Sequence, residues 1–182
     1  ITEAVRKVTG LACKLVGAGM KTGMNIRMDD PKHIGSDLIV DSVAAKANYP
    51  LPIIVIDMGT ATSITALDKN GDYVGGVIHP GLRVSLNTLS GSTAQLPSID
   101  LESPGRALAK NTIEAMQSGI LYGTAGMLDG ILTRMEKELG SKATIVATGG
   151  LARFVTPLCQ HPIEIDDLLL LKGLLILYRK NS

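Results

Sequence analysis

One apolar stretch, residues 53–57 (IIVID), constrains the fold of this chain more than any other feature. It is apolar without a break until Asp57, which is the pattern of a strand buried on both faces of a sheet. A corner of small and hydroxyl-bearing residues follows, Gly59 to Thr62 (GTAT). In open α/β sheets, ligands bind just beyond the carboxyl ends of such strands. The stretch therefore predicts an α/β sheet with a polar site at the end of a central strand.

Residues 53–78 predict three consecutive strands. The second and third strand patterns, TSITALD and DYVGGVI, are joined by the corner Asp68 to Gly71 (DKNG), where Asn-Gly suits a turn that needs positive φ. Further along the chain, KATIVATGG predicts another buried strand that ends in Gly149 and Gly150, and PIEI predicts a short strand.

Helical patterns occur between and around these strands. The apolar spacing of residues 3–16 predicts a helix closed by Gly17 and Gly19, and residues 20–35 are loop-like. Ser36 is a suitable N-cap for a helix that runs to about residue 47. Further helices are predicted near residues 82–90, from a capping box of Asn111 and Glu114 to Gly140, at the start of LARFVTPL, and in the final segment 166–180.

Four glycines form a stripe along one face of the long predicted helix, because they recur three or four residues apart: Gly119, Gly123, Gly126 and Gly130. A stripe of this kind lets another helix approach closely. A dimer interface and tight packing within the chain would both use it, and both interpretations stay open at this stage.

The charge balance argues against nucleic acid and anionic membranes as partners. The formal net charge is +1, from 18 basic and 17 acidic residues, and no block of like charge occurs. The apolar run of residues 168–178 is broken by Lys172 and Gly173 and is too short to span a bilayer. Cys13 and Cys159 have no CxxC or histidine-spaced partners, which is typical of a reducing compartment, so we expect a cytoplasmic protein.

Asp57 and the corner after it are candidates for phosphate binding. Gly59 would let backbone N–H groups approach an anion, and the Thr60 and Thr62 hydroxyls could add donors. Asp57 could hold a cation that neutralises the phosphate charge. The alternative interpretation is a hairpin whose acid accepts hydrogen bonds from turn amides.

Two further positions are candidates for chemistry. The turn of residues 148–150 also follows a strand, and together with the first corner it suggests a nucleotide between two strand ends. Asp37, in the first turn of its helix, could accept the proton of a substrate hydroxyl during phosphoryl transfer. The plainer interpretation is an acid that favours a helix N-terminus. The three histidines have no metal-like spacing.

Several motifs in one order resemble the type III pantothenate kinases, whose relatives include proteins called Bvg accessory factors. They run from about Leu15 to the C-terminus: IGSD, IDMGTATS, GGVIHPG, TAQLP, NTIEAMQSGILYG, ATGGLA and LLLLKGLLILYRKN. The resemblance implies an α/β fold of the actin-like ATPase type, as in sugar kinases, heat-shock protein 70 and actin. It further implies that residues 1–49 are a remnant of the first lobe, carrying a substrate loop, and that residues 50–182 are the second lobe.

The resemblance also implies an activity, which is transfer of the ATP γ-phosphoryl group to pantothenate. The product is 4′-phosphopantothenate, in the first step of coenzyme A synthesis. The family works as a homodimer and needs Mg²⁺ together with a monovalent cation, K⁺ or NH₄⁺.

Substrate-binding residues carry over position by position. Gly35, Ser36, Asp37 and Leu38 match the family's pantothenate-binding tetrapeptide, and Asp37 matches its proton acceptor. Thr112 matches a threonine that reaches pantothenate across the dimer interface.

Nucleotide- and cation-binding residues carry over in the same way. Asp57 matches the ligand of the monovalent cation, and Thr60 matches a residue that contacts ATP phosphate, with Gly59 beside it.

Three departures from the family pattern stand out. Leu38 replaces an arginine that could pair with the pantothenate carboxylate, and Met28 replaces a tyrosine. A basic residue elsewhere, such as Arg83 or Arg106, is a candidate substitute. Residues 1–50 lack the Asp-Xaa-Gly-Asn-Thr corner of the family's first phosphate loop. We therefore expect an N-terminally truncated chain with little or no kinase activity alone, because phosphoryl transfer depends on positioning and charge stabilisation.

Two alternatives stay open at this stage. One is a non-catalytic regulatory relative of the Bvg accessory type. The other is an actin-like kinase that acts on another small alcohol.

Overall fold

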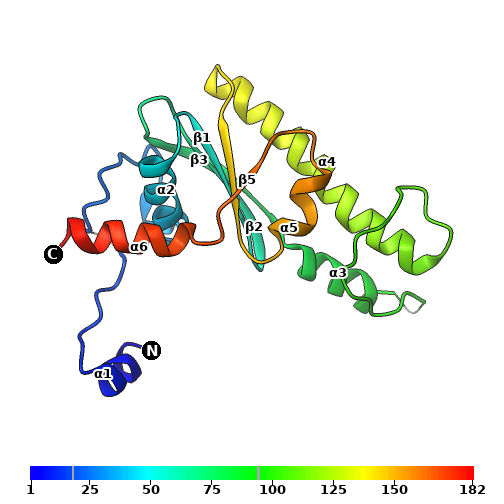
Figure 1. Cartoon of the computed structure of the whole chain (residues 1–182), viewed down its shortest axis with the longest axis horizontal. Helices are drawn as coiled ribbons and strands as arrows, with labels where there is room; N and C mark the ends of the chain where they lie inside the picture. The colour runs from blue at the N-terminus through cyan, green and yellow to red at the C-terminus, as the bar shows by residue number, and fades with distance from the viewer. Residues whose placement is uncertain (18, 94) are drawn as a thin grey trace.

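The computed structural model describes residues 1–17, 19–93 and 95–182. Its centre is a five-stranded sheet in the order β3-β2-β1-β4-β5 (Figure 1). β4 runs parallel to β1 and β5 runs parallel to β4, whereas β2 is antiparallel to both β1 and β3. The strands span Ile53–Met58 (β1), Ala61–Leu67 (β2), Tyr73–Pro80 (β3), Thr144–Thr148 (β4) and Glu164–Ile165 (β5). The predicted α/β class and the predicted strands are confirmed.

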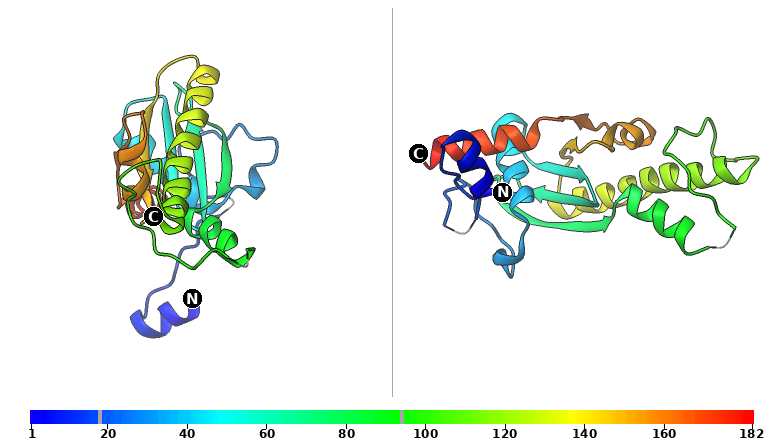
Figure 2. Two further views of the ribbon diagram at one scale, coloured as in Figure 1. Left: turned by 90° about the vertical axis from the view of Figure 1, so that its right-hand side faces the viewer. Right: turned by 90° about the horizontal axis from the view of Figure 1, so that it is seen from below.

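The helices are α1 (Thr2–Thr9), α2 (Ser36–Asn48), α3 (Leu82–Gly91), α4 (Thr112–Leu139), α5 (Ala152–Val155) and α6 (Leu169–Lys180), with short 3₁₀-helices η1 (Pro31–His33) and η2 (Thr156–Leu158). Of these, α2 lies on one face of the sheet, and α4 and α5 lie on the other (Figures 1 and 2).

The turn between β2 and β3 forms as its residues predict. Asp68 Oδ1 accepts hydrogen bonds from the backbone N–H groups of Asn70 (2.8 Å) and Asp72 (3.0 Å). Gly71 adopts a φ of +73°, in the left-handed region that favours glycine. The chain therefore reverses tightly, and β3 becomes an edge strand of the sheet.

One face of the sheet is covered by α4 and α5. Leu121, Leu128 and Leu132 of α4 are fully buried in one cluster with Ile54 and Ile56 of β1. Burying each such side chain contributes about 1.5–3 kcal/mol. The ends of α4 follow the predicted signals, because the Asn111 side chain accepts a hydrogen bond from the N–H of residue 114 and residue 140 ends the helix in a left-handed conformation.

The other face is covered by α2, with α6 packed against α2 (Figure 1). Residues 39–45 of α2 are all buried, and Ala44 and Ala45 belong to one cluster with Ile53 and Val55 of β1. Gly173 of α6 lies directly against the backbone of Val40, where a Cβ on the glycine would stand only 2.8 Å from the Val40 carbonyl carbon. The helix α2 is therefore enclosed between the sheet and α6.

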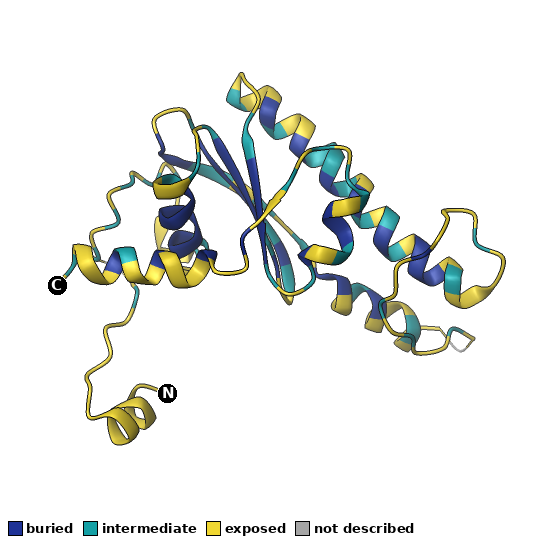
Figure 3. Ribbon diagram, viewed as in Figure 1, coloured by how far each residue is buried: buried dark blue, intermediate teal, exposed yellow. Residues whose placement is uncertain are grey.

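The N-terminal prediction needs correction. The helix predicted over residues 3–16 ends at Thr9, because Gly10 takes a left-handed conformation (φ +73°) and closes it. None of the residues of α1 is buried, and the helix projects from the rest of the molecule (Figure 3). Val16 instead packs against the cluster that α2 and α6 form.

The predicted N-cap at Ser36 is wrong by one residue. Gly35 occupies the cap position of α2, and no side chain caps it. The boundary predicted after residue 49 stays a prediction, although α2 precedes that boundary and packs on the sheet that follows it. None of the helices in the described part of the chain is long and apolar enough to cross a membrane.

Among the residues that the structure describes, no helix packs against the glycine stripe of α4. Apart from the adjacent residues and the backbone of α4 itself, an added Cβ at Gly119, Gly123 or Gly126 would meet no described atom within 4 Å, and one at Gly130 would meet only the Arg134 guanidinium at 3.4 Å. The interpretation of tight packing within the chain is therefore wrong for the described residues. Packing against a second copy stays a prediction.

A first prediction concerns the turn after β4. Gly149 has a φ of +94°, and a Cβ there would stand 2.6 Å from the carbonyl oxygen of Met58, whereas a Cβ on Gly150 would meet nothing within 4 Å. We expect Gly149→Ala to lower the free energy of unfolding by about 2 kcal/mol or more, because it adds both backbone strain and a clash. Urea unfolding measures this, with Gly150→Ala as the matched control. Equal stabilities of the two variants would contradict the prediction.

Candidate functional site

Asp57 lies near the carboxyl end of β1 and faces α2. Side chains alternate along a strand, so Asp57 shares a face with Ile53 and Val55, which pack against α2. Its carboxylate is partly exposed, and no described turn amide donates a hydrogen bond to it. The alternative interpretation, in which Asp57 accepts hydrogen bonds from the amides of its own hairpin turn, is therefore not supported.

Asp37 reaches the same region from the first turn of α2. Its side chain is exposed, and Oδ1 accepts a hydrogen bond from the backbone N–H of Leu38 at 2.9 Å. Burial raises the pKa of Asp57, and the negative charge of Asp37 raises it further. The two carboxylates thus lie close enough to share one electrostatic field.

A third carboxylate, Asp41, was not singled out by the sequence reasoning. It follows Asp37 by four residues, so the two lie on one side of α2. Asp41 is only 2% exposed, and its Oδ1 has no hydrogen-bond partner among the described residues. Burial raises its pKa to about 7, with further contributions from the negative charges of Asp57, Asp37 and Asp166. An acid in an otherwise apolar helical run was the signal that could have found it.

The neighbouring Asp166 shows what Asp41 lacks. Lys172 lies 2.6 Å from Asp166, and the Tyr49 hydroxyl donates to it at 3.0 Å. No described basic side chain forms such a pair with Asp37, Asp41 or Asp57. The region therefore carries uncompensated negative charge.

The two glycine corners touch each other at the end of β1. Thr148 of β4 pairs with Asp57, and the backbone of Gly149 lies directly on that of Met58. Gly59 and Thr60 are exposed beside them. The N–H of Gly59 donates to the carbonyl of residue 61 at 3.0 Å, so this amide is used inside the hairpin. The exposed Thr60 hydroxyl stays available to a ligand.

The predicted substrate tetrapeptide opens α2 and borders a cavity. Gly35 and Leu38 line this cavity of about 160 Å³, together with Met28. The Asp37 carboxylate lies over Gly35, because an added Cβ on that glycine would clash with Asp37 Oδ1. Ser36 is exposed at the start of the helix.

Thr112 is not brought to this region. It is the first residue of α4, and that end of α4 lies at the opposite end of the molecule from α2 in Figure 1 and in the right-hand view of Figure 2. Within one chain, Thr112 therefore does not join Asp37 and Asp57.

The donors near Asp57 fit a cation, although they do not form a complete metal site. In residues 1–17, 19–93 and 95–182 no group of three or more His, Cys, Asp or Glu side chains could hold a metal ion alone. The Oδ1 of Asp41 has no hydrogen-bond partner among the described residues, and the pKa values of Asp41 and Asp57 are raised. Both observations indicate that a bound cation would stabilise these carboxylates. Carboxylate oxygens are the ligands that hard cations such as Mg²⁺ and K⁺ take.

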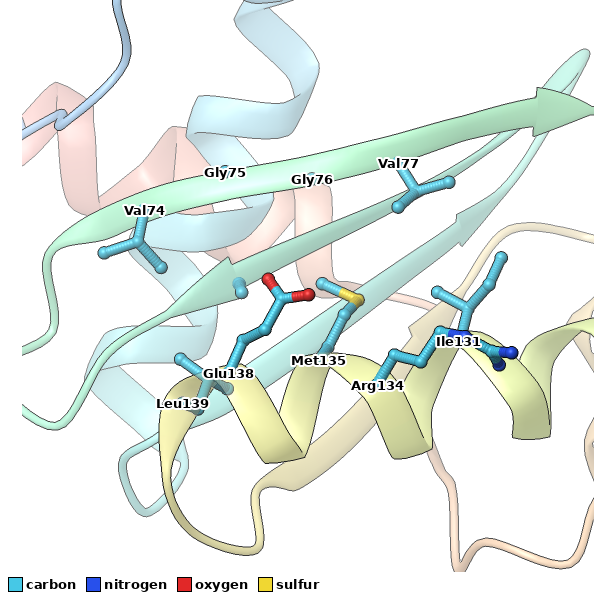
Figure 4. Close-up of a pocket in the computed structure, with 10 residues that line it drawn as sticks. Val74, Gly75, Gly76, Val77, Ile131, Arg134, Met135, Glu138 and Leu139 are labelled. Carbon is cyan, nitrogen blue, oxygen red and sulfur yellow. The ribbon is translucent and has the colours of Figure 1, made fainter.

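A larger cavity lies elsewhere, between β3 and the C-terminal half of α4 (Figure 4). It measures about 380 Å³, and Val74, Val77, Ile131 and Met135 give it an apolar lining. None of the predicted site residues lines it.

Comparison with known proteins gives one consistent result. A family model described as type III pantothenate kinase matches residues 1–134. The type III pantothenate kinase of Moorella thermoacetica is 43% identical over 182 residues, covering 100% of this chain and 72% of the relative. That of Listeria welshimeri is 45% identical over 168 residues, covering 92% of this chain and 65% of the relative. The chain thus spans about two thirds of the length of the relatives it matches.

Solved structures show the fold. A Baf family protein of Campylobacter jejuni, described as a transcriptional activator, matches with a TM-score of 0.57 and 22% identity, covering 85% of this chain and 69% of that one. The activator of the 2-hydroxyisocaproyl-CoA dehydratase of Clostridium difficile, solved with bound ADPNP, matches with a TM-score of 0.50 and 18% identity, covering 97% and 78%. The chain has the mixed α/β fold of the actin-like ATPases, as predicted.

A second prediction concerns pH. The Asp41 carboxyl has an ordinary pKa of 3.8 and a pKa of about 7 in the folded chain. Between these values the folded state holds a proton that the unfolded state has lost, so the free energy of unfolding falls as pH rises from about 4 to about 7. Asp57 acts in the same direction. We expect the free energy of unfolding of wild type to fall by an amount on the order of 2–4 kcal/mol over this window through Asp41, and Asp41→Asn should lack this fall.

Chemical denaturation at several pH values measures this effect. Asp29→Asn removes an exposed acid and is the matched control. If Asp41→Asn and wild type lose stability in parallel between pH 4 and pH 7, the assignment of Asp41 is wrong.

Proposed function

The chain belongs to the type III pantothenate kinase family, and we propose that the protein containing it transfers the γ-phosphoryl group of ATP to the primary hydroxyl of pantothenate. The product would be 4′-phosphopantothenate, the first intermediate on the route to coenzyme A. One observation carries the proposal at residue level: Asp37 and Asp57 share an electrostatic field at the carboxyl edge of the sheet, beside two abutting glycine corners.

Asp37 is suited to accept the proton of the substrate hydroxyl. Its Oδ1 is held by the Leu38 amide, which fixes the carboxylate and leaves Oδ2 free. Its exposed position at the start of a rigid helix lets a hydroxyl approach. A carboxylate so placed removes the proton as the phosphoryl group is transferred.

The corners beside Asp57 are suited to the nucleotide phosphates. Thr60 has an exposed hydroxyl, and the exposed Gly150 leaves its backbone accessible because it has no side chain. Gly59, whose amide is used inside the hairpin, keeps the chain beside Thr60 free of a side chain. Asp57, with Asp41 behind it, would hold a monovalent cation and stabilise Mg²⁺ that the phosphates carry. When bound, these cations neutralise charge on the phosphates during transfer.

Thr112 enters the proposal through a second copy of the chain. It lies too far from α2 to act within one chain, and the open glycine stripe on the same helix offers a surface for close helix packing. A homodimer through α4 would therefore bring Thr112 of one copy toward the substrate of the other.

A second candidate is an actin-like kinase for another small alcohol. Leu38 and Met28 favour it, since both are apolar in the cavity next to the tetrapeptide. A substrate panel with the full-length protein separates the two candidates. A regulatory relative would phosphorylate none of the alcohols.

A third prediction tests Asp37. In the full-length protein, Asp37→Asn should lower kcat for pantothenate phosphorylation by ~10²–10⁴, because the amide cannot accept the proton. ATP affinity should stay the same. Asp29→Asn, which removes a nearby exposed acid, is the control and should leave kcat unchanged. Unchanged turnover of Asp37→Asn would remove this residue from the mechanism.

A fourth prediction tests the dimer. Asp37→Asn and Thr112→Ala proteins should each have low activity, but mixing them after dissociation should restore about a quarter of the wild-type rate, because half of the dimers are mixed and each mixed dimer has one intact site. Sedimentation measures the dimer itself. No recovery on mixing, with mixed dimers present, would mean that Thr112 does not act across the interface.

A further inference from the structure

The cavity beside the tetrapeptide is built by a loop held against the edge strand. The loop of residues 25–27 bonds to Tyr73 of β3, with Tyr73 N–H donating to Asn25 O at 2.9 Å and Arg27 N–H donating to Tyr73 O at 2.8 Å. The Asp72 carboxylate adds an ion pair with Arg27 at 2.6 Å and accepts from the Asn25 amide at 3.0 Å. These contacts fix the chain just before the residues that line the cavity.

The cavity is mostly apolar, with one pair of ionisable groups at its mouth. Met28, Ile34 and Val77 line it. Apart from a tyrosine, Asp30 and His33 are the only titratable side chains among the described lining residues. Within the part of the chain that the structure describes, His33 is therefore the only basic side chain that lines this cavity. Arg83 lines a different cavity, and Arg106 does not line this one.

Asp30 fixes the orientation of His33. Its Oδ1 accepts a hydrogen bond from the Lys32 N–H at 3.2 Å, and its Oδ2 lies 2.8 Å from His33 Nδ1. A carboxylate only accepts, so Nδ1 carries the hydrogen of this bond. The other ring nitrogen, Nε2, is then free for a ligand, and a ring that donates from both nitrogens carries a positive charge.

The size of the cavity limits what it holds. Whole-ligand sites usually measure ~300–1,000 Å³, so a cavity of about 160 Å³ takes one end of a small molecule. Asp37 does not line it, although its neighbours Gly35 and Leu38 do. A substrate whose hydroxyl reaches Asp37 would therefore place its other end in this cavity.

We propose that His33, oriented by Asp30, binds the carboxylate end of the substrate in this cavity. The inference rests on the proposed function, and it names the side chain that selects an acid over its uncharged analogue. Leu38 offers no charge, whereas His33, when protonated on both ring nitrogens, donates a charge-assisted hydrogen bond from Nε2.

Kinetics of the full-length protein with two substrates test the proposal. The substrates are pantothenate and its uncharged primary amide, and the variants are His33→Ala, His33→Arg and Lys32→Ala. We expect His33→Ala to raise KM for pantothenate about tenfold and to leave kcat and the KM for the amide unchanged. His33→Arg should keep KM for pantothenate near the wild-type value, because the cation is retained. Lys32→Ala removes a neighbouring cation that does not line the cavity and should change neither KM.

Calorimetric titration of the same proteins with pantothenate separates failure of this inference from failure of the proposed function. If wild type binds pantothenate without phosphorylating it, the proposed function fails, and a tenfold weaker dissociation constant of His33→Ala still supports His33. If wild type phosphorylates pantothenate and His33→Ala changes both substrates equally, or neither, the inference is wrong. Absence of binding to wild type overturns both. Melting temperatures confirm that the variants are folded.

Discussion

The enclosure of α2 between the sheet and α6 is the constraint on which the rest of the structure depends. Ala44 and Ala45 allow the helix to lie close to β1, and Gly173 allows α6 to lie close to its other side. Because the apolar residues of α2 must face these surfaces, the rotation of the helix about its axis is fixed. That rotation buries Asp41 and leaves Asp37 one turn earlier at the surface, opposite Asp57.

This arrangement links folding to charge. Three carboxylates lie close together, while Lys172 is paired with the neighbouring Asp166. Concentrated negative charge away from water is unfavourable until a proton or a cation compensates it. A cation bound here would therefore stabilise a bound phosphate. It would also stabilise the folded chain, since anything that binds only the folded state shifts the folding equilibrium. The same packing that makes the helix stable thus makes the site depend on its ligands.

Local patterns predicted the parts of the fold that local interactions decide. The strands of residues 53–80, the Asp68 turn and both ends of α4 depend on neighbours in the sequence, and all three were predictable. The errors arose where a distant surface decides. Val16 packs on α2 and α6 rather than extending a helix, and Asp41 is buried in the packed fold although its own neighbours in the sequence do not require it. The positions of Asp37 and Asp57 were predictable as a helix end and a strand end, whereas the burial of the third acid, Asp41, depends on tertiary packing, although its place in an apolar helical run was a signal.

The residues proposed for phosphoryl transfer and those proposed for substrate recognition lie on different parts of the fold. Asp37 and Asp57 belong to a helix and a strand that the core holds rigidly, so their spacing resists change. His33 and Met28 belong to a loop that bonds to Tyr73 and Asp72 at the edge of the sheet, and Met28 packs against the core cluster that α2 and β1 share. The exposed side chain of His33 lies outside that cluster, so a substitution there changes the proposed substrate contact with little effect on the position of Asp37. Leu38 lies at the border of both parts, because its side chain lines the cavity while its backbone N–H, which any residue except proline would supply, donates to Asp37 Oδ1.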